Sequence, residues 1–345
     1  MRAKRVLPLL LVMAFVAVAC STERGEGGGG GDDENGALPS IIVQHVPADP
    51  SAIPLVVMKE MGLDEKHGFV AELLETDFDA STSVFVLGES DISVEQDIVN
   101  MAIDRNEGHE VVTWYPGLNY ITSVIVLEDS PYQSPEDLVG ERVGHYGVES
   151  GGTTTISLTY QEFYGIDIFE EFDLREAGPG ALPQLLVNGE VEAIFLYEPL
   201  GTTAIVEGPG RYLLEPAKVW QEERGWAPWL TNLASREEWL QQNPDLALAF
   251  RDAWDEALDV IEESNWEILR EDYMVDFMQI PSEEELDRFI EYSAELPLFG
   301  RKWDQEEIEQ SEAYIELLVD NELLVEQVPE GPIAVELEAY LGETE

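Results

Sequence analysis

One nine-residue pattern occurs twice in this chain, as VLGESDISV at residues 86–94 and as VNGEVEAIF at residues 187–195. In both copies an apolar helix end is followed by Gly-Glu, then by an acidic residue and a short apolar run. Glycine suits the position just after a helix because it has no Cβ to clash in the left-handed conformation. Gly88 and Gly189 lie about 100 residues apart, which is close to the length of a small domain or lobe. The pattern therefore predicts two similar α/β lobes; a chance match between two common helix–strand junctions is the alternative.

Strand and helix patterns alternate along most of the chain, which is typical of parallel or mixed sheets covered by helices on both faces. From Arg236 onward the pattern is almost entirely helical, and we expect this region to pack back on the first lobe. The predicted strands are 41–46, 69–75, 91–94, 110–115, 122–127, 142–145, 173–176 and 193–196, and the predicted helices between them are 52–68, 81–87, 95–105, 153–164 and 179–187.

The N-terminus has the pattern of a secretory signal. Basic residues at positions 2, 4 and 5 precede an apolar run from Val6 to Ala19 that is too short to span a bilayer comfortably. The run ends AVAC, which resembles a bacterial lipoprotein signal, although such signals usually carry leucine at the position of Ala17. The resemblance implies cleavage before Cys20 and lipidation of its sulfur, and an ordinary Ala-x-Ala signal is the alternative. Since Cys20 is the only cysteine, the chain has no disulfide to form.

Residues 21–38 are rich in glycine and acidic residues and show no periodicity, so we expect a flexible tether. The folded part then begins near residue 39. We predict a first lobe from residues 39–128 and 233–345 and a second lobe from residues 129–232. The two hinge crossings are placed near Leu127–Pro131 and Leu230–Ser235.

The charge of the chain excludes several partners. It has 72 acidic and 18 basic residues, a net charge of −54. Nucleic acids and anionic lipid surfaces would be repelled by this charge. Because the acidic residues are spread over every helix pattern, we interpret them as a solvated surface adapted to a saline exterior. A cationic ligand is the functional alternative.

Four stretches, one of which contains the second copy of the repeated pattern, resemble one family. They are MGLDEKHGF at 61–69, SPEDLVGERVG at 134–144, LVNGEVEAIFLYEP at 186–199 and SREEWLQQNP at 235–244. In this order they are similar to the type II periplasmic solute-binding proteins of the nitrate/sulfonate/taurine and thiamine-precursor family of ABC importers. The resemblance implies two Rossmann-like α/β lobes joined by two hinge crossings, with a small-molecule ligand closed between them. It also implies an extracytoplasmic monomer that delivers its ligand to a membrane permease and its ATPase.

A ligand in such sheets lies beyond the carboxyl ends of the strands, at helix N-termini. Glycines there let the backbone approach a ligand, and free N–H groups can hold an anion or a polar group. Simple helix capping and core packing are the alternatives. The candidate ligand-binding residues are Gln44, His45, Asp79, Ser81, Thr82, Glu95, Tyr120, Tyr146, Ser150, Gly151, Gly152, Thr153, Thr154, Tyr197, Glu198 and Trp229. Among these, the family resemblance implies that the stretch Ser150–Thr155 contributes to the pocket.

The candidate loops contain carboxylates and aromatic rings but no lysine or arginine. A buried anion would be opposed by these carboxylates, whereas rings suit a planar, neutral or cationic ligand. We therefore favour a thiamine-precursor-like pyrimidine or another heterocycle, with Glu198 as its best polar contact. An alkanesulfonate, taurine or nitrate ligand is the alternative, as is a membrane-anchored sensor or hydrolase with the same fold.

No catalytic or metal motif accompanies these residues. The four histidines are scattered, and the chain contains no His-Glu-x-x-His, Gly-x-Ser-x-Gly or P-loop sequence. We expect neither an enzyme nor a bound cofactor or metal.

Overall fold

The computed structural model describes residues 37–77, 80–148, 150–323 and 327–341, and residues Leu38–Glu345 form one compact unit. The predicted signal, the lipidation residue Cys20, most of the tether and the candidate Asp79 lie outside the described residues. Within the described part, no helix is long and apolar enough to cross a membrane.

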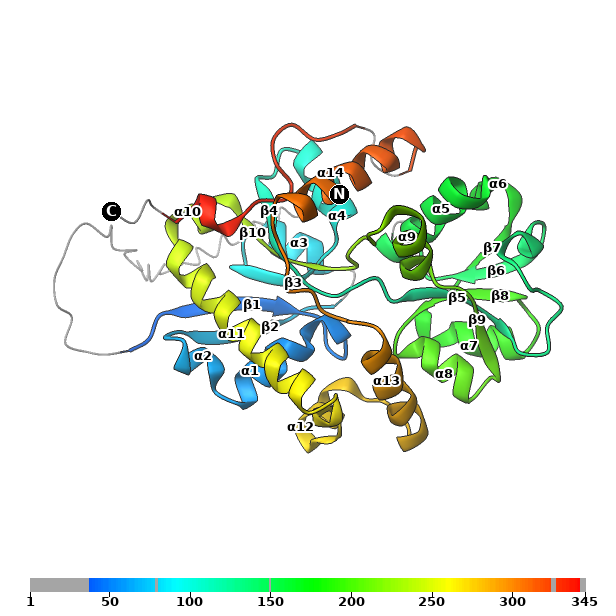
Figure 1. The fold of residues 1–345 in the computed structure, drawn as a ribbon, viewed down its shortest axis with the longest axis horizontal. Helices are drawn as coiled ribbons and strands as arrows, with labels where there is room; N and C mark the ends of the chain where they lie inside the picture. Colours follow the sequence, from blue (N-terminus) through cyan, green and yellow to red (C-terminus); the bar gives the residue numbers. More distant parts are fainter. Residues whose placement is uncertain (1–36, 78–79, 149, 324–326, 342–345) are drawn as a thin grey trace, which may run out of the picture. The chain divides into compact units, whose positions relative to one another are not determined.

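Two five-stranded mixed sheets organise the described residues (Figure 1). The first sheet has the order β2-β1-β3-β10-β4, in which β10 runs antiparallel to β3 and β4. The second sheet has the order β7-β6-β8-β5-β9, in which β5 runs antiparallel to β8 and β9. The strands are β1 Ser40–His45, β2 Val70–Glu75, β3 Ile92–Gln96, β4 Val111–Pro116, β5 Thr122–Leu127, β6 Arg142–His145, β7 Asp173–Glu176, β8 Ala193–Tyr197, β9 Gly210–Leu214 and β10 Asn232–Arg236.

Helices cover both sheets, and each sheet with its helices is called a lobe below. The helices of the first lobe before the crossing are α1 Ile53–Glu60, α2 Leu63–Lys66, α3 Ser81–Val86 and α4 Ile98–Asn106. The second lobe has α5 Gly151–Tyr164, α6 Ile168–Glu171, α7 Leu182–Val187, α8 Leu200–Val206 and α9 Pro216–Arg224. The C-terminal helices are α10 Glu237–Gln242, α11 Pro244–Glu263, α12 Asp272–Met278, α13 Glu283–Glu295 and α14 Gln305–Asp320.

The two sheets have the same topology, as the repeated pattern predicts. Each copy of the pattern ends a helix, α3 or α7, and opens the central strand that follows, β3 or β8. Gly88 and Gly189 both have positive φ angles, +80° and +69°, which a residue with a Cβ adopts only at a cost.

The acidic residue of the pattern has the same role in both lobes. Asp91 accepts a hydrogen bond from the backbone N–H of Ile42 in β1 at 2.9 Å. Glu192 accepts one from the N–H of Arg142 in β6 at 3.2 Å. Both carboxylates therefore join the start of the third strand to the neighbouring first strand, which explains why the pattern contains an acid at this position.

The first crossing lies elsewhere than predicted. Strand β5 pairs with β8 and β9, so it belongs to the second sheet, and the chain crosses at residues 117–121 and not at Leu127–Pro131. The apolar pattern of residues 122–127 fits a strand in either lobe, so it could not indicate the partner strands. The chain returns between α9 and β10, at residues 225–231.

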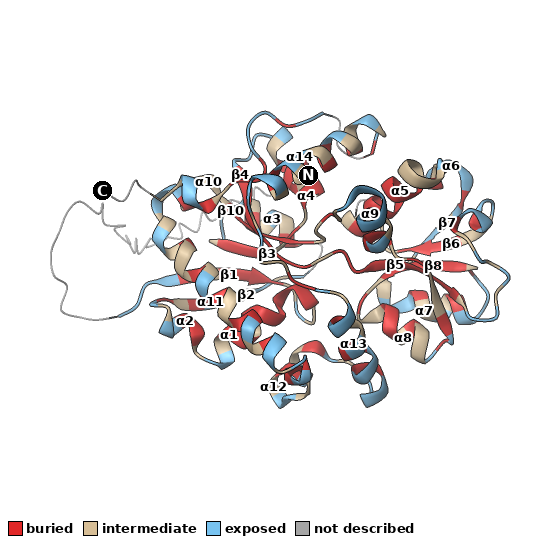
Figure 2. Ribbon diagram, viewed as in Figure 1, coloured by how far each residue is buried: buried red, intermediate tan, exposed pale blue. Residues whose placement is uncertain are grey.

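The C-terminal helices contact both lobes. Helix α11 packs on α1 and α2, and α14 packs on α4, as expected for a return to the first lobe. Helix α13, however, packs on α8 of the second lobe. One apolar cluster, here called the inter-lobe cluster, also joins the lobes at α14; its buried members include Met101, Leu158, Trp220, Tyr314 and Leu318. Figure 2 shows that buried residues lie mainly along the strands of the two sheets and that the outer faces of the helices are largely exposed.

Candidate ligand-binding cleft

A cleft lies where the carboxyl ends of the central strands of the two lobes face each other. The first lobe contributes Asp49, Glu95 and Asp97, which follow β1 and lie at the end of β3. The second lobe contributes Tyr146, the start of α5, and Tyr197 at the end of β8. The connecting segments add Leu118, Ile121, Leu230 and Thr231. Its open volume is about 60 Å³, below the roughly 300–1,000 Å³ of most ligand sites. A ligand of ordinary size therefore requires the lobes to move apart.

The first turn of α5 forms the wall of the second lobe. Ser150 caps the helix, because its hydroxyl accepts a hydrogen bond from the N–H of Thr153 at 3.1 Å. A Cβ at Gly151 would lie 2.9 Å from Cγ of Asp97, and one at Gly152 would overlap the hydroxyl of Tyr146. Glycines at these two positions therefore allow the backbone of α5 to approach both lobes closely.

Two carboxylates of the first lobe share one serine. Oε1 of Glu95 accepts hydrogen bonds from the N–H of Val46 at 3.0 Å and from the hydroxyl of Ser51 at 2.9 Å. Oδ1 of Asp49 accepts from the N–H of Ser51 at 2.9 Å. Burial, and then the charge of Asp49, raise the pKa of Glu95 well above its usual range. Burial also raises the pKa of Asp49. This side of the cleft thus favours a proton or a cation.

A tyrosine pair forms part of the opposite wall. The rings of Tyr146 and Tyr197 meet edge to face, with centroids 5.3 Å apart. The hydroxyl of Tyr146 lies 3.1 Å from Oγ1 of Thr122 in β5. Burial raises the pKa values of both phenols, so they stay neutral. No lysine, arginine or histidine is among the described residues that line the cleft.

The structure brings together six of the residues predicted from the sequence. They are Glu95, Tyr146, Ser150, Gly151, Gly152 and Tyr197, and all of them line the cleft. Thr153 and Thr154 follow in α5 but are buried behind its first turn. Tyr120 is also buried, and its hydroxyl donates to the carbonyl oxygen of Gly152.

The remaining candidates of the first lobe do not line the cleft. The side chain of Gln44 is buried and donates to Oγ1 of Thr76 at 3.1 Å and to the carbonyl oxygen of Ser81 at 2.8 Å, so it fixes the start of α3. Thr82 lies in the same short helix. The ring of His45 is buried beside Phe277, and burial lowers its pKa. Among the described residues its Nε2 atom has no hydrogen-bond partner.

Glu198 and Trp229 also lie away from the cleft. Glu198 is fully buried, and its Oε2 atom accepts hydrogen bonds from the N–H and the hydroxyl of Thr202 at 2.9 and 2.7 Å. Its Oε1 atom accepts from the hydroxyl of Tyr212 at 2.5 Å. Trp229 packs against Gly300. The sequence suggested Glu198 as the best polar ligand contact. These hydrogen bonds instead give its side chain a structural role.

Sequence reasoning missed Asp49 and Asp97 as cleft residues. Both cap helical turns: Asp49 accepts from Ser51, and Oδ1 of Asp97 accepts from the N–H groups of Val99 and Asn100 at 2.9 Å. An aspartate just after a strand and before a helix pattern signals a cap. Because such a cap also lies at the carboxyl end of its strand, the same signal marks a position near the ligand.

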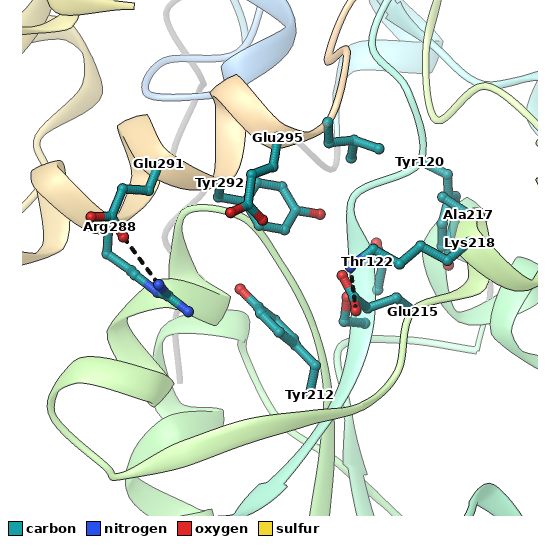
Figure 3. A pocket seen from close by; sticks show the side chains of 12 residues that line it. Tyr120, Thr122, Tyr212, Glu215, Ala217, Lys218, Arg288, Glu291, Tyr292 and Glu295 are labelled. Carbon is teal, nitrogen blue, oxygen red and sulfur yellow. Dashed lines mark hydrogen bonds and ion pairs between the residues drawn. The ribbon is translucent and has the colours of Figure 1, made fainter.

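A second, larger cavity of about 310 Å³ lies between β9, the start of α9 and α13 (Figure 3). Four of its charged side chains form local ion pairs, Lys218 with Glu215 at 2.8 Å and Arg288 with Glu291 at 3.1 Å. Tyr212 and Tyr292 point into it from opposite sides. Its lining includes strand residues of the second sheet but none of the first sheet, so we regard the smaller cleft, which both sheets line, as the primary site. Among the residues that the structure describes, no three of His, Cys, Asp and Glu are grouped to hold a metal ion.

The sequence pattern of one family matches residues 50–269, more than half of the chain. The chain belongs to the NMT1-like family. No curated protein matches the sequence. Solved structures with the type II periplasmic-binding-protein fold resemble this NMT1-like protein over most of its length.

Three of these structures illustrate the likeness. The periplasmic aliphatic sulphonate binding protein of Escherichia coli has a TM-score of 0.68 at 15% identity and covers 87% of this chain and 94% of its own. The alkanesulfonate-binding protein of Xanthomonas axonopodis pv. citri, bound to MOPS, has a TM-score of 0.69 at 16% identity and covers 87% and 99%. The periplasmic nitrate-binding protein of Synechocystis has a TM-score of 0.56 at 18% identity and covers 73% and 70%. At these identities the likeness establishes the shared fold.

Proposed function

We propose that this NMT1-like protein is the solute-binding component of an ABC importer. The observation that carries the proposal is the cleft formed by both lobes at the carboxyl ends of their central strands, with two chain crossings beside it. Family membership and the fold support it, because the structural neighbours are named as sulfonate- and nitrate-binding proteins and not as enzymes. The protein would work outside the cytoplasmic membrane as a monomer, anchored by a lipid on Cys20.

The cleft would act by closing on its ligand. A solute binds to one lobe, the lobes rotate about residues 117–121 and 225–231, and the solute is removed from water. A ligand shifts this equilibrium only by the difference between its affinities for the closed and open forms. A permease that contacts both lobes could then distinguish the loaded form by its shape.

We further propose that the solute is a small planar base, such as an aminopyrimidine, which binds neutral or protonated. Three carboxylates line the cleft without a lysine or arginine among its described lining residues. Because burial raises the pKa of Glu95, this carboxyl can donate a hydrogen bond to a ring nitrogen or exchange its proton for a cation. The rings of Tyr146 and Tyr197 offer an apolar wall for a flat ligand.

An anionic ligand is the second candidate. The names of the structural neighbours favour it, and so does the N-terminus of α5 at the cleft, since free N–H groups at a helix start attract anions. The carboxylates of the cleft oppose it.

Thermal shift and titration calorimetry on residues 21–345 test the proposal. We expect aminopyrimidines or other planar bases to raise the melting temperature by several degrees, and ethanesulfonate, taurine and nitrate to have no effect. Glu95→Gln should lower the affinity for a protonated base about 10-fold or more, whereas the exposed Glu89→Gln should leave it unchanged. Stabilisation by a sulfonate or nitrate would retain the importer and reject the basic ligand; no response to any solute of this panel would count against import of these classes.

A further inference from the structure

The carboxylate of Asp97 lies across the cleft against the first turn of α5. An ideal Cβ at Gly151 would be 2.9 Å from Cγ of Asp97 and 3.1 and 3.2 Å from its two carboxylate oxygens. Asp97 belongs to the first lobe, where it caps α4, and Gly151 begins α5 in the second lobe. One side chain of the first lobe therefore faces the start of a helix in the other.

The start of α5 is a place that attracts negative charge. The helix has 14 residues, and its first N–H groups have no partner within the helix. Together with the helix dipole they favour a nearby anion, most strongly where the site is partly buried. Ser150 caps one of these groups, the N–H of Thr153. Asp97 brings a carboxylate to the same end of the helix.

We infer that Asp97 determines the ligand specificity of the cleft by holding its own carboxylate at the N-terminus of α5, where the anionic group of a solute would otherwise bind. This inference rests on the proposed binding function of the cleft. An incoming sulfonate or nitrate meets the carboxylate of Asp97 at the end of α5, and Asp49 and Glu95 on the opposite wall offer it no positive charge. The cleft rejects anions both by occupying their position and by like-charge repulsion.

Asp97 has two separate relations, as the cap of α4 and as a neighbour of α5 across the cleft. Its Oδ1 atom accepts two hydrogen bonds from α4 and its Oδ2 atom accepts one from the side chain of Asn100, so it caps α4 well. Asp304 has a matching role at α14, where it accepts a hydrogen bond from the N–H of Glu306 at 3.0 Å, but it is exposed and is not among the lining residues of the cleft. A comparison of variants at Asp97 and Asp304 therefore separates the effect of losing a helix cap from an effect on ligand specificity.

The test compares Asp97→Ser with Asp304→Ser. Serine is a good N-cap, so both helices keep a cap, and both variants lose one negative charge. Serine at position 97 is shorter and uncharged, which frees the start of α5. Calorimetry with sodium ethanesulfonate and sodium sulfate, at ionic strength held constant with sodium chloride, should show binding by Asp97→Ser at least about 10-fold tighter than by the wild type or Asp304→Ser.

Asp97→Asn provides a second variant if the serine protein folds poorly, as judged by circular dichroism. Asparagine caps as well as aspartate and removes the charge but not the bulk, so its gain in anion affinity should be smaller than that of serine. Ethanesulfonate binding by the wild type, or no gain in either Asp97 variant, would overturn the inference. Anion binding gained by the variants while no planar base binds the wild type would keep the inference and reject the proposed basic ligand.

Discussion

At the scale of single residues, the end of β8 shows how strand geometry separates a cleft residue from a core residue. Successive side chains along a strand point to opposite faces. Tyr197 lines the cleft, whereas the next residue, Glu198, is fully buried and bonds to Thr202 and Tyr212. In the sequence both residues precede Pro199, and nothing there shows which of the two side chains turns inward.

We predict that Glu198→Ala lowers the free energy of unfolding of the unliganded protein by about 2–4 kcal/mol, because it leaves buried donors on Thr202 and Tyr212 without a partner. Urea denaturation measures the change. Glu207→Ala, at the exposed end of the same helix α8, is the control and should change the value by less than about 0.5 kcal/mol. An unchanged urea midpoint for Glu198→Ala would return Glu198 to the list of ligand contacts.

The burial of Asp104 in α4 should make the stability of the protein depend on pH. It is 7% exposed, and burial raises its pKa to about 6, although the charge of His109 opposes the shift. The folded protein then binds a proton that the unfolded chain, with a pKa near 3.8, has lost. Stability is therefore lost as the pH rises from about 4 to about 6, by up to about 3 kcal/mol.

Asp104→Asn should accordingly raise the free energy of unfolding at pH 7.5 and have little effect near pH 3, below the unfolded pKa of 3.8. Urea titrations at several pH values check this, with the exposed Glu89→Gln, which does not contribute to the pKa of Asp104, as the control. A stability gain of equal size at every pH would mean that the charge of Asp104 is not its cause.

At the scale of elements, the sequence patterns predicted individual strands and helix starts, because these depend mainly on neighbouring residues. Residues 41–46 and 193–196 were expected to be strands, and all of them except residue 46 lie in β1 and β8, because short apolar runs bounded by polar residues indicate buried strands. The cap and glycines at the start of α5 were also readable. Strand β9, Gly210–Leu214, was not predicted, since its middle residues are only partly buried and give no clear alternation.

The long-range arrangement could not be read from the sequence. The apolar pattern of β5 is satisfied equally by partners in either sheet, and only its pairing with β8 and β9 moves the first crossing to residues 117–121. The position of Asp97 against Gly151 likewise depends on how two distant elements approach each other. Of the candidates at the start of α5, Ser150, Gly151 and Gly152 line the cleft, whereas those on the short helix α3 do not.

At the scale of the whole molecule, a large negative charge opposes the apolar contacts that hold the elements together. The basic residues are few, and several hold more than one carboxylate: Arg270 pairs with Glu267, Glu283 and Asp287. Such exposed pairs contribute little each. Most of the 72 acidic side chains therefore repel one another across the surface.

Screening of this repulsion should stabilise the protein as salt is added. We predict that the urea midpoint rises steeply between about 0.01 and 0.5 M sodium chloride, as the Debye length falls from roughly 30 Å to a few Å, and then levels off. The net charge of −54 sets the direction, because folding brings the carboxylates closer together. A midpoint that instead keeps rising in proportion to salt above 1 M would indicate strengthened apolar burial rather than screening. Sucrose, which strengthens burial without screening charge, separates the two causes: it should raise the midpoint equally at low and high salt, whereas sodium chloride should act mainly at the low end.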